Sequence, residues 1–391
     1  MIQKRIIDSF EQEFAAYIGT KYAIGTSMGR TALFAVLNAI GVEENDEIIM
    51  PAYICEVVPN SVLKLKGVPI FVDINLKDYH ISISHLQTLI NSRTKAIIID
   101  HIFGYPEDVD VIKEIIDKSG QKIFLIEDAA HALGAEYKGK KVGNLCDIAI
   151  FSLAKNMLNF GGGAITTNND IVAHKAKEFV INSTGLSFIN QMFFGMISYF
   201  DRRRVNSKLF NRLMELLEFC SKKFQFGRKD YDQSLKIPAT FSMSKLQAFV
   251  FLSQLKKVNY TNAKMIDNQT ILDKMLGNFN SIDILRSKIE NSKHVCTWYV
   301  IRIKDTGLTQ QLIGDCRKSN VFLSTFWDPL CSTQLYNTIQ TCKDVPNSLY
   351  QSKCTLIFKM NPYLSEFELK KIAMCLKNFI IGDINEDPAS Y

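Results

Sequence analysis

The sequence predicts an α/β protein in which helices cover both faces of a mainly parallel, seven-stranded sheet, followed by a smaller α+β domain. Two observations carry this prediction. Between residues 22 and 167, short runs rich in Ile, Val and Phe alternate with amphipathic segments, which is the pattern of parallel strands joined by helices. After residue 295, the runs CTWYVIRI and SEFELKKIAMCLKNFI predict strands and helices outside this alternation.

The expected elements follow from where the apolar runs begin and end. Helices with apolar residues three and four positions apart are expected at Arg30–Ile40, Glu56–Lys64, Ile83–Ile90 and Val109–Ser119. Seven strands are expected at Tyr22–Thr26, Glu47–Met50, Val68–Asp73, Lys95–Ile102, Lys122–Asp128, Asp147–Leu153 and Gly163–Thr167. A chain of 391 residues is long enough for two domains, expected at residues 1–250 and 251–391. The larger one contains a helical insert at about residues 184–236.

The composition is that of an ordinary globular enzyme, with 22% charged and 47% hydrophobic residues. The net charge of +6 is spread along the chain, so it gives little support to nucleic-acid binding. The first residues lack the apolar core of a signal peptide, and no run reaches the roughly 18 apolar residues of a membrane-spanning helix, so we expect a cytoplasmic protein. Nine cysteines without a CxxC pair and six dispersed histidines predict reduced thiols and no metal site.

Two acids end the apolar strand in IEDAAHALGA (126–135), and a histidine follows the second acid by three residues. In parallel α/β sheets, ligands bind beyond the carboxyl ends of the strands. Asp128 could therefore pair with a protonated ring nitrogen, and His131 could touch the same ring. Alternatively, Glu127 and Asp128 cap a following helix, and His131 is a hydrogen-bonded core residue.

A lysine and three glycines follow the next strand, in FSLAKNMLNFGGGAITT (151–167). Apolar surroundings disfavour the ammonium form of a lysine, so Lys155 would be available as a free amine for Schiff-base chemistry. The glycines permit close approach of the backbone. The alternative is an ordinary surface lysine in a loop.

The first strand leads into TSMGRTALFAVLNAIG (26–41), in which a helix begins at Gly29. The first-turn amides of a helix point at any anion placed there, and phosphate suits such a position. Arg30 would add a positive charge. A simple strand-to-helix turn is the alternative.

The order of these three segments resembles the DegT/DnrJ/EryC1/StrS family of aminotransferases, which use pyridoxal 5′-phosphate (PLP) and act on sugars. The likeness runs along nearly the whole chain and includes FEQEFAAYIGTKYAI (10–24), GVEENDEIIMPAY (41–53), GVPIFVDINLKDYHI (67–81), HIFGYPEDVD (101–110), YKGKKVG (137–143), MSKLQAFVFLSQLKKV (243–258) and KMNPYLSEFEL (359–369). The resemblance implies the fold type I architecture of PLP-dependent transferases, with PLP as the cofactor.

The resemblance also implies a role for each residue that matches a family position. Lys155 would carry PLP as a Schiff base and move the substrate proton, and Asp128 would hold the pyridinium nitrogen. His131 would contact the ring oxygen. The phosphate would lie between Ser152 and the turn formed by Met28, Gly29 and Arg30.

The sequence departs from the family pattern at several of these positions. Arg30 replaces the usual threonine of the phosphate turn, which removes a hydroxyl and adds a cation. Cys55 stands where an aromatic residue usually stacks on the ring, so Tyr53 is the candidate for that contact. Thr240 replaces the asparagine that a partner subunit usually lends to the phosphate, and the segment from Ser152 to Lys155 is two residues shorter than usual.

By this resemblance, the enzyme would move an amino group from an amino acid, with glutamate as the expected donor, to a nucleotide-linked keto sugar. It would act as a homodimer. Two alternatives remain open from the sequence: a PLP-dependent lyase or aldolase on the same fold, and a noncatalytic regulatory homologue. Lys155 argues against the sugar dehydratases of the family, in which histidine replaces the lysine.

The apolar stretch from Phe188 to Arg204 allows two interpretations. Phe193, Phe194, Ile197 and Phe200 could meet lipid while Arg202–Arg204 meet anionic headgroups. The favoured alternative is a helical insert that packs over the active-site entrance or at a subunit interface.

Overall fold

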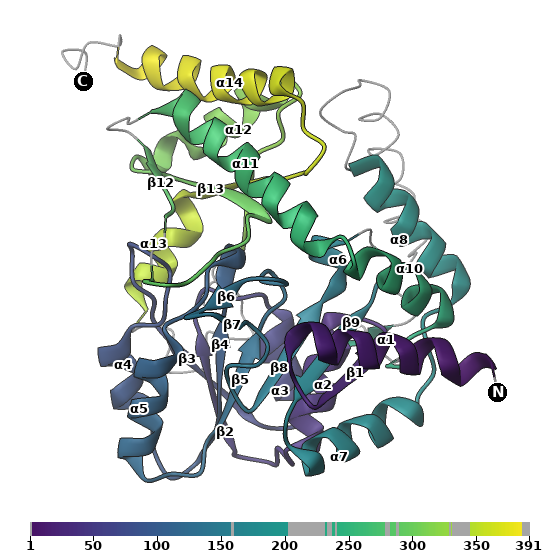
Figure 1. The fold of residues 1–391 in the computed structure, drawn as a ribbon. Helices are drawn as coiled ribbons and strands as arrows, with labels where there is room; N and C mark the ends of the chain where they lie inside the picture. The colour runs from purple at the N-terminus through teal and green to yellow at the C-terminus, as the bar shows by residue number, and fades with distance from the viewer. Residues whose placement is uncertain are drawn as a thin grey trace.

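A seven-stranded sheet forms the centre of the larger part of the molecule in the computed structural model (Figure 1). The structure describes residues 2–157, 160–201, 231–232, 237–238, 241–277, 282–286, 289–327, 330 and 345–384. In spatial order the strands are β1 (Tyr22–Thr26), β9 (Gly163–Thr167), β8 (Ile148–Ser152), β5 (Phe124–Asp128), β4 (Thr94–Asp100), β2 (Glu47–Pro51) and β3 (Val68–Val72). β9 is antiparallel to both of its neighbours, and the other pairs are parallel. The predicted α/β class and mainly parallel sheet are confirmed.

Helices cover both faces of this sheet because its strands are apolar on both sides. Along β4, Ile97 and Ile99 belong to one hydrophobic cluster, while Ala96 and Ile98 belong to the other, as the two-residue period of a strand requires. The first cluster is closed by α1 (Ile2–Ile18), α4 (Ile83–Leu89), α5 (Val109–Ser119) and α10 (Lys245–Leu255). The second is closed by α2 (Gly29–Ala39), α3 (Val57–Lys64) and α7 (Asp170–Ile181).

The strand that was expected to run to Ile102 ends at Asp100, two residues earlier. A 3₁₀ turn, η1 (Ile102–Gly104), follows, in which Phe103 and Gly104 have φ angles of 57° and 95°. A Cβ on Gly104 would lie 2.1 Å from the carbonyl oxygen of Val295, so only glycine allows this approach. The early end leaves Asp100 as the terminal residue of its strand.

A smaller C-terminal unit lies beside the large sheet, above it in Figure 1. Its four antiparallel strands are, in order, β12 (Ile282–Ile284), β13 (Trp298–Ile303), β15 (Thr355–Lys359) and β14 (Ser324–Thr325). Its helices are α11 (Val258–Leu276), η3 (Thr306–Leu308), α12 (Thr309–Lys318), α13 (Pro346–Cys354) and α14 (Glu366–Ile384). Val258 still packs in the core of the large sheet, whereas Met265 packs in the core of the small one. The helix α11 thus passes from one core to the other, and the domain boundary near residue 250 stays a prediction.

The remaining elements are short or peripheral. They comprise the hairpin of β6 (Glu136–Tyr137) and β7 (Lys140–Lys141), the turn α6 (Leu153–Asn156), the helix α8 (Phe188–Asp201), and the pair β10 (Tyr231–Asp232) and β11 (Ile237–Pro238). Most of the predicted helical insert after α8, including Arg202–Arg204, lies outside the described residues. No helix among the described residues is long and apolar enough to cross a membrane.

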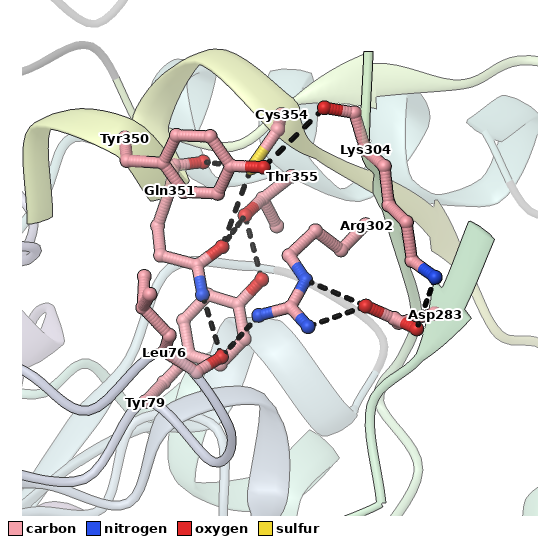
Figure 2. A network of polar contacts seen from close by, with 9 residues as sticks. All are labelled: Leu76, Tyr79, Asp283, Arg302, Lys304, Tyr350, Gln351, Cys354 and Thr355. Carbon is pink, nitrogen blue, oxygen red and sulfur yellow. Dashed lines mark hydrogen bonds and ion pairs between the residues drawn. The ribbon is translucent and has the colours of Figure 1, made fainter. Parts of the chain in front are cut away.

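The loop after β3 joins the large sheet to the small domain (Figure 2). The carbonyl oxygen of Leu76 accepts hydrogen bonds from Arg302 on β13 and, at 2.8 Å, from Gln351 on α13. The hydroxyl groups of Tyr79 and Thr355 lie 2.7 Å apart. Arg302 also forms an ion pair with Asp283, so its guanidinium group is held from two sides. These contacts fix β13 and β15 relative to the large sheet.

Asp73, at the end of β3, caps α13 from across the domain interface. Its carboxylate accepts hydrogen bonds from the backbone amides of Asn347 at 3.0 Å and Ser348 at 2.8 Å, and from the Ser348 hydroxyl at 2.7 Å. Asp73 is only 5% exposed. A carboxylate in this place satisfies first-turn amides and complements the positive end of the helix dipole.

Replacing Asp73 with alanine should lower the free energy of unfolding by about 2–3 kcal/mol, because the buried amide of Ser348 and the partly buried amide of Asn347 would lose their acceptor. Urea unfolding followed by far-UV circular dichroism measures this change. Asp170→Ala is the matched control, since Asp170 is an exposed carboxylate paired with Lys21 on the surface, and it should shift the urea midpoint much less. Equal midpoints for the two variants would contradict the capping role of Asp73.

Candidate active site

A cavity of about 350 Å³ opens where the carboxyl ends of β4, β5 and β8 meet the first turn of α2 and the small domain. Residues that the sequence placed in three separate segments share this cavity. Of the predicted site residues, those that line it are Met28, Gly29, Arg30, Cys55, Asp128, His131, Ser152 and Lys155. Thr240 lies outside the described residues.

The two acids that end β5 have different surroundings. Glu127 is fully buried and accepts hydrogen bonds from the backbone amides of Gly143 and Leu145, at 2.7 and 2.8 Å. Asp128 lines the cavity instead, and its Oδ1 accepts the amide of Ala130 at 3.0 Å. Residues 129–135 form turns rather than a helix, so the helix-capping alternative for the two acids is wrong. Burial raises the pKa of Asp128 to about 6, although the Ala130 amide opposes this rise.

Lys155 lies on the short turn α6, directly after β8, and its side chain stands open into the cavity. Desolvation by the surrounding protein lowers the pKa of Lys155 below its ordinary value, and the positive charges of Lys359 and Arg30 lower it further. A lowered pKa makes the neutral, nucleophilic amine easier to reach. The structure places Lys155 in the lining of the cavity, and its role as the Schiff-base lysine stays a prediction from the sequence.

The glycine segment after Lys155 is held by hydrogen bonds from α10. Gln247, which is fully buried, donates from Nε2 to the carbonyl oxygens of Ser27 at 3.1 Å and Phe160 at 2.8 Å. Gly162 has a φ of 102°, and a Cβ there would lie 2.2 Å from the ring of Phe251. The carbonyl of Gly162 accepts the Leu153 amide at 3.1 Å, which ties this segment to the turn that carries Lys155.

The start of α2 and the end of β8 approach each other closely at one edge of the cavity. A Cβ on Gly29 would lie 2.8 Å from the Cβ of Ser152, so glycine is needed for this approach. The first-turn amides of α2 and the Ser152 hydroxyl therefore lie beside one another, and Arg30 lines the same edge. This edge combines helix-terminal amides, a hydroxyl and a cation, which suits a phosphate group.

Aromatic side chains form another wall of the cavity. Trp298 and Trp327 line it, and the ring of Trp327 is stacked on His131 with centroids 5.9 Å apart. Burial and the charge of Lys155 lower the pKa of His131 well below its usual range, so this imidazole is neutral. Tyr53 does not line the cavity; it packs on Tyr79 and Trp327, with centroids 5.8 and 5.3 Å away.

The sequence did not indicate four further residues that line the cavity: Asp100, Trp298, Trp327 and Lys359. A signal for Asp100 was present, because it is the last polar residue of an apolar strand. Trp298 and Lys359 lie at the ends of β13 and β15 in the small domain, and Trp327 follows β14. Whether Trp298, Trp327 and Lys359 reach the cavity depends on how the small domain packs against the large sheet.

Helix α8 also reaches this site, since Phe194 lines the cavity and Phe193 is buried. Neither side chain is therefore available for lipid. Among the α8 residues whose side chains the structure describes, the large exposed apolar ones are Phe188, Ile189, Met192, Met196 and Tyr199.

Unpartnered polar atoms indicate that the cavity is built for a polar ligand. In the described part of the chain, four buried side-chain nitrogen or oxygen atoms have no hydrogen-bond partner. Three belong to cavity-lining residues: Asp100 Oδ1, His131 Nδ1 and Trp298 Nε1. Because unpaired buried polar groups are costly, atoms of this kind are expected where a ligand completes the site.

A lysine with a lowered pKa, a buried carboxylate and a phosphate-type edge in one cavity fit PLP, and with this sheet they define a PLP-dependent enzyme of fold type I. A profile of the DegT/DnrJ/EryC1/StrS aminotransferase family matches residues 1–377. The chain belongs to this family of PLP-dependent aminotransferases.

Individual proteins agree with this assignment. The chain is 38% identical over 197 residues to GDP-perosamine synthase of Caulobacter vibrioides, which covers 50% of this chain and 52% of that protein. It is 24% identical over 386 residues to the spore coat polysaccharide biosynthesis protein SpsC of Bacillus subtilis, covering 96% and 90%. An aminotransferase structure from Psychrobacter cryohalolentis matches the fold with a TM-score of 0.78 at 20% identity, covering 97% of this chain and 92% of that one.

Proposed function

We propose that this enzyme transfers the amino group of an amino acid, with glutamate as the expected donor, to a nucleotide-linked keto sugar. The observation that carries the proposal is the meeting of Lys155, Asp128 and the Gly29 turn in one cavity. The names of two relatives support the class of acceptor. One is GDP-perosamine synthase, and the other is the dTDP-3-amino-3,6-dideoxy-α-D-galactopyranose transaminase of Aneurinibacillus thermoaerophilus, which is 38% identical over 174 residues, 43% of this chain and 47% of that protein.

In this proposal each residue has a distinct task. PLP, when bound, supplies a ring that accepts the electrons released as the amino donor loses its α-proton. Lys155 Nζ takes that proton from Cα of the donor. Asp128 holds the positive charge of the ring nitrogen. Neutral His131 offers a hydrogen bond to the ring oxygen without adding charge.

The charges around the cavity support anionic substrates. Arg30, at the edge proposed for the phosphate, and Lys359, at the end of β15, both line the cavity together with Lys155. Amino-acid carboxylates and nucleotide phosphates are attracted to such a set of cations. We further propose that Cys55 and Trp327 would contact the ring when PLP is bound, with Trp327 in the role that an aromatic residue usually has in the family, and that Thr240 comes from the partner subunit of a homodimer.

Product analysis tests the reaction type. The purified enzyme should convert glutamate to 2-oxoglutarate only when a nucleotide-linked keto sugar is present, and an aminated sugar should form in equal amount. A β-hydroxy amino acid given alone should release no aldehyde. Aldehyde release without amino transfer would show that the enzyme is an aldolase and not a transaminase. Absence of both activities in protein that binds PLP would favour a noncatalytic homologue.

A further inference from the structure

A second aspartate, Asp100, lies beside Asp128 at the end of the neighbouring strand. β4 and β5 are adjacent and parallel, and Asp100 pairs in register with Asp128. Neighbours in register on adjacent strands are about 4.8 Å apart and project from the same face of the sheet. Both side chains line the cavity. The carboxyl group of Asp128 therefore has a second carboxyl group next to it.

Asp100 is buried in a setting that disfavours a second negative charge. It is 4% exposed, and its Oδ1 has no hydrogen-bond partner among the described residues. The charged or titratable groups that act on it or share its cavity are Asp128, Glu107, Lys155, Arg30, His131, Cys55 and Lys359. Two of them, Asp128 and Glu107, are acids that act on Asp100 from close by, and two buried like charges side by side are not both ionised.

The pKa values of the two carboxyl groups differ, and this difference decides which of them keeps the proton. Burial raises the pKa of Asp100 well above its ordinary range, and the charge of Asp128 raises it further. The pKa of Asp128 rises only to about 6, because the Ala130 amide stabilises its anion. When the pair carries a single proton, that proton therefore resides on Asp100 and the negative charge on Asp128.

We propose that Asp100 is a positioning residue: as a neutral carboxylic acid, it donates a hydrogen bond to the Asp128 carboxylate and keeps that carboxylate charged and oriented toward the ring nitrogen. This role rests on the proposed function, in which Asp128 holds the ring. It explains why a buried acid with an unsatisfied oxygen lies at this point of the cavity. The positioning acid and the charged acid act as a pair with one net negative charge.

The protonation state can be measured on the full chain without cofactor. Asp100→Asn keeps the size of the side chain and removes its titration. In the unfolded wild type, Asp100 loses its proton near pH ~4, whereas the folded protein keeps it. Stability from this group is thus present below about pH 4 and is lost as the pH rises. As the pH rises above about 4, the unfolding constant of the wild type, divided by that of Asp100→Asn, should rise by up to about tenfold per pH unit. A ratio that does not change with pH would contradict the claim that Asp100 is protonated in the folded protein.

PLP binding tests the positioning role through a conservative and a nonconservative variant. An asparagine amide can still donate to Asp128, whereas Asp100→Val has a similar size and no donor. The Kd for PLP, measured from the visible absorption of the bound cofactor, should be at least about tenfold higher in Asp100→Val than in Asp100→Asn. Equal affinities of the two variants would overturn the hydrogen bond. Weaker binding of PLP by Asp100→Asn than by the wild type would also overturn the proposal, because Asp100 would then act as a second anion.

The wild-type protein separates this inference from the proposed function. Wild type that binds no PLP would overturn the assignment of Asp128 as the partner of the ring. Wild type that binds PLP, together with equal affinities of the valine and asparagine variants, would overturn the role of Asp100 alone.

Discussion

Alanine in place of Lys155 should abolish measurable amino transfer, with kcat lower by at least about 10²–10⁴-fold. The reason is that, in the proposed function, Lys155 supplies both the covalent attachment of PLP and the group that moves the substrate proton. The visible absorption band of lysine-bound PLP should disappear as well. The fold should be retained, because the side chain stands open in the cavity and packs into neither hydrophobic cluster of the sheet. Stopped-flow assays, absorption spectra and thermal melts measure these three effects.

Lys359→Ala is the matched control, because Lys359 lines the same cavity from the opposite domain. This variant should keep the absorption band, although its affinity for anionic substrates should fall. A band that persists in Lys155→Ala, or that disappears only in Lys359→Ala, would contradict the assignment of the attachment site.

Asparagine in place of Asp128 should lower kcat by about 10²–10³-fold, the usual effect of losing a preorganised electrostatic contact at a reacting centre. Asparagine keeps the shape of the side chain but provides no negative charge for the ring nitrogen. At pH 8 the Kd for PLP should also be higher in Asp128→Asn than in the wild type. Equal Kd values would exclude the ion pair.

The pH dependence of PLP binding gives a second measurement of the same contact. Because burial raises the pKa of Asp128 to about 6, its anion is present above pH 6 and is lost below it. Binding of PLP to the cofactor-free wild type should weaken by up to about tenfold per pH unit below pH 6. Asp128→Asn should lack this decline. Equilibrium dialysis between pH 5 and 8 compares the two proteins.

The sheet was predictable because its strands are buried on both faces. Apolar runs such as Ile97–Ile99, alternating with amphipathic segments, are typical of parallel strands that lie between two layers of helices. The polar residues that directly follow these runs then fall at one edge of the sheet. For this reason Asp128, Ser152 and Lys155 could be assigned to a common site before their contacts were known.

Other parts of the site depend on contacts between residues far apart in the chain. Asp100 was not assigned to the site because its strand was expected to continue to Ile102, whereas in the structure the strand ends at Asp100 and Gly104, in the turn that follows, lies close to Val295. Trp298 and Lys359 reach the cavity because the Leu76 loop and Asp73 hold the small domain in place. Such contacts leave no periodic pattern in the sequence.

By itself, the sequence determined the α/β class, the order of the strands along the chain and the three segments that carry Lys155, Asp128 and Gly29. These features depend on local periodicity and on which residues follow each strand. The tertiary structure decided that Asp128 rather than Glu127 faces the cavity, that Tyr53 lies outside it, and that Asp100 joins Asp128. The physical reason is that the fate of a buried polar side chain depends on partners from distant segments, such as the amides that bind Glu127, and these partners are brought together only when the chain folds.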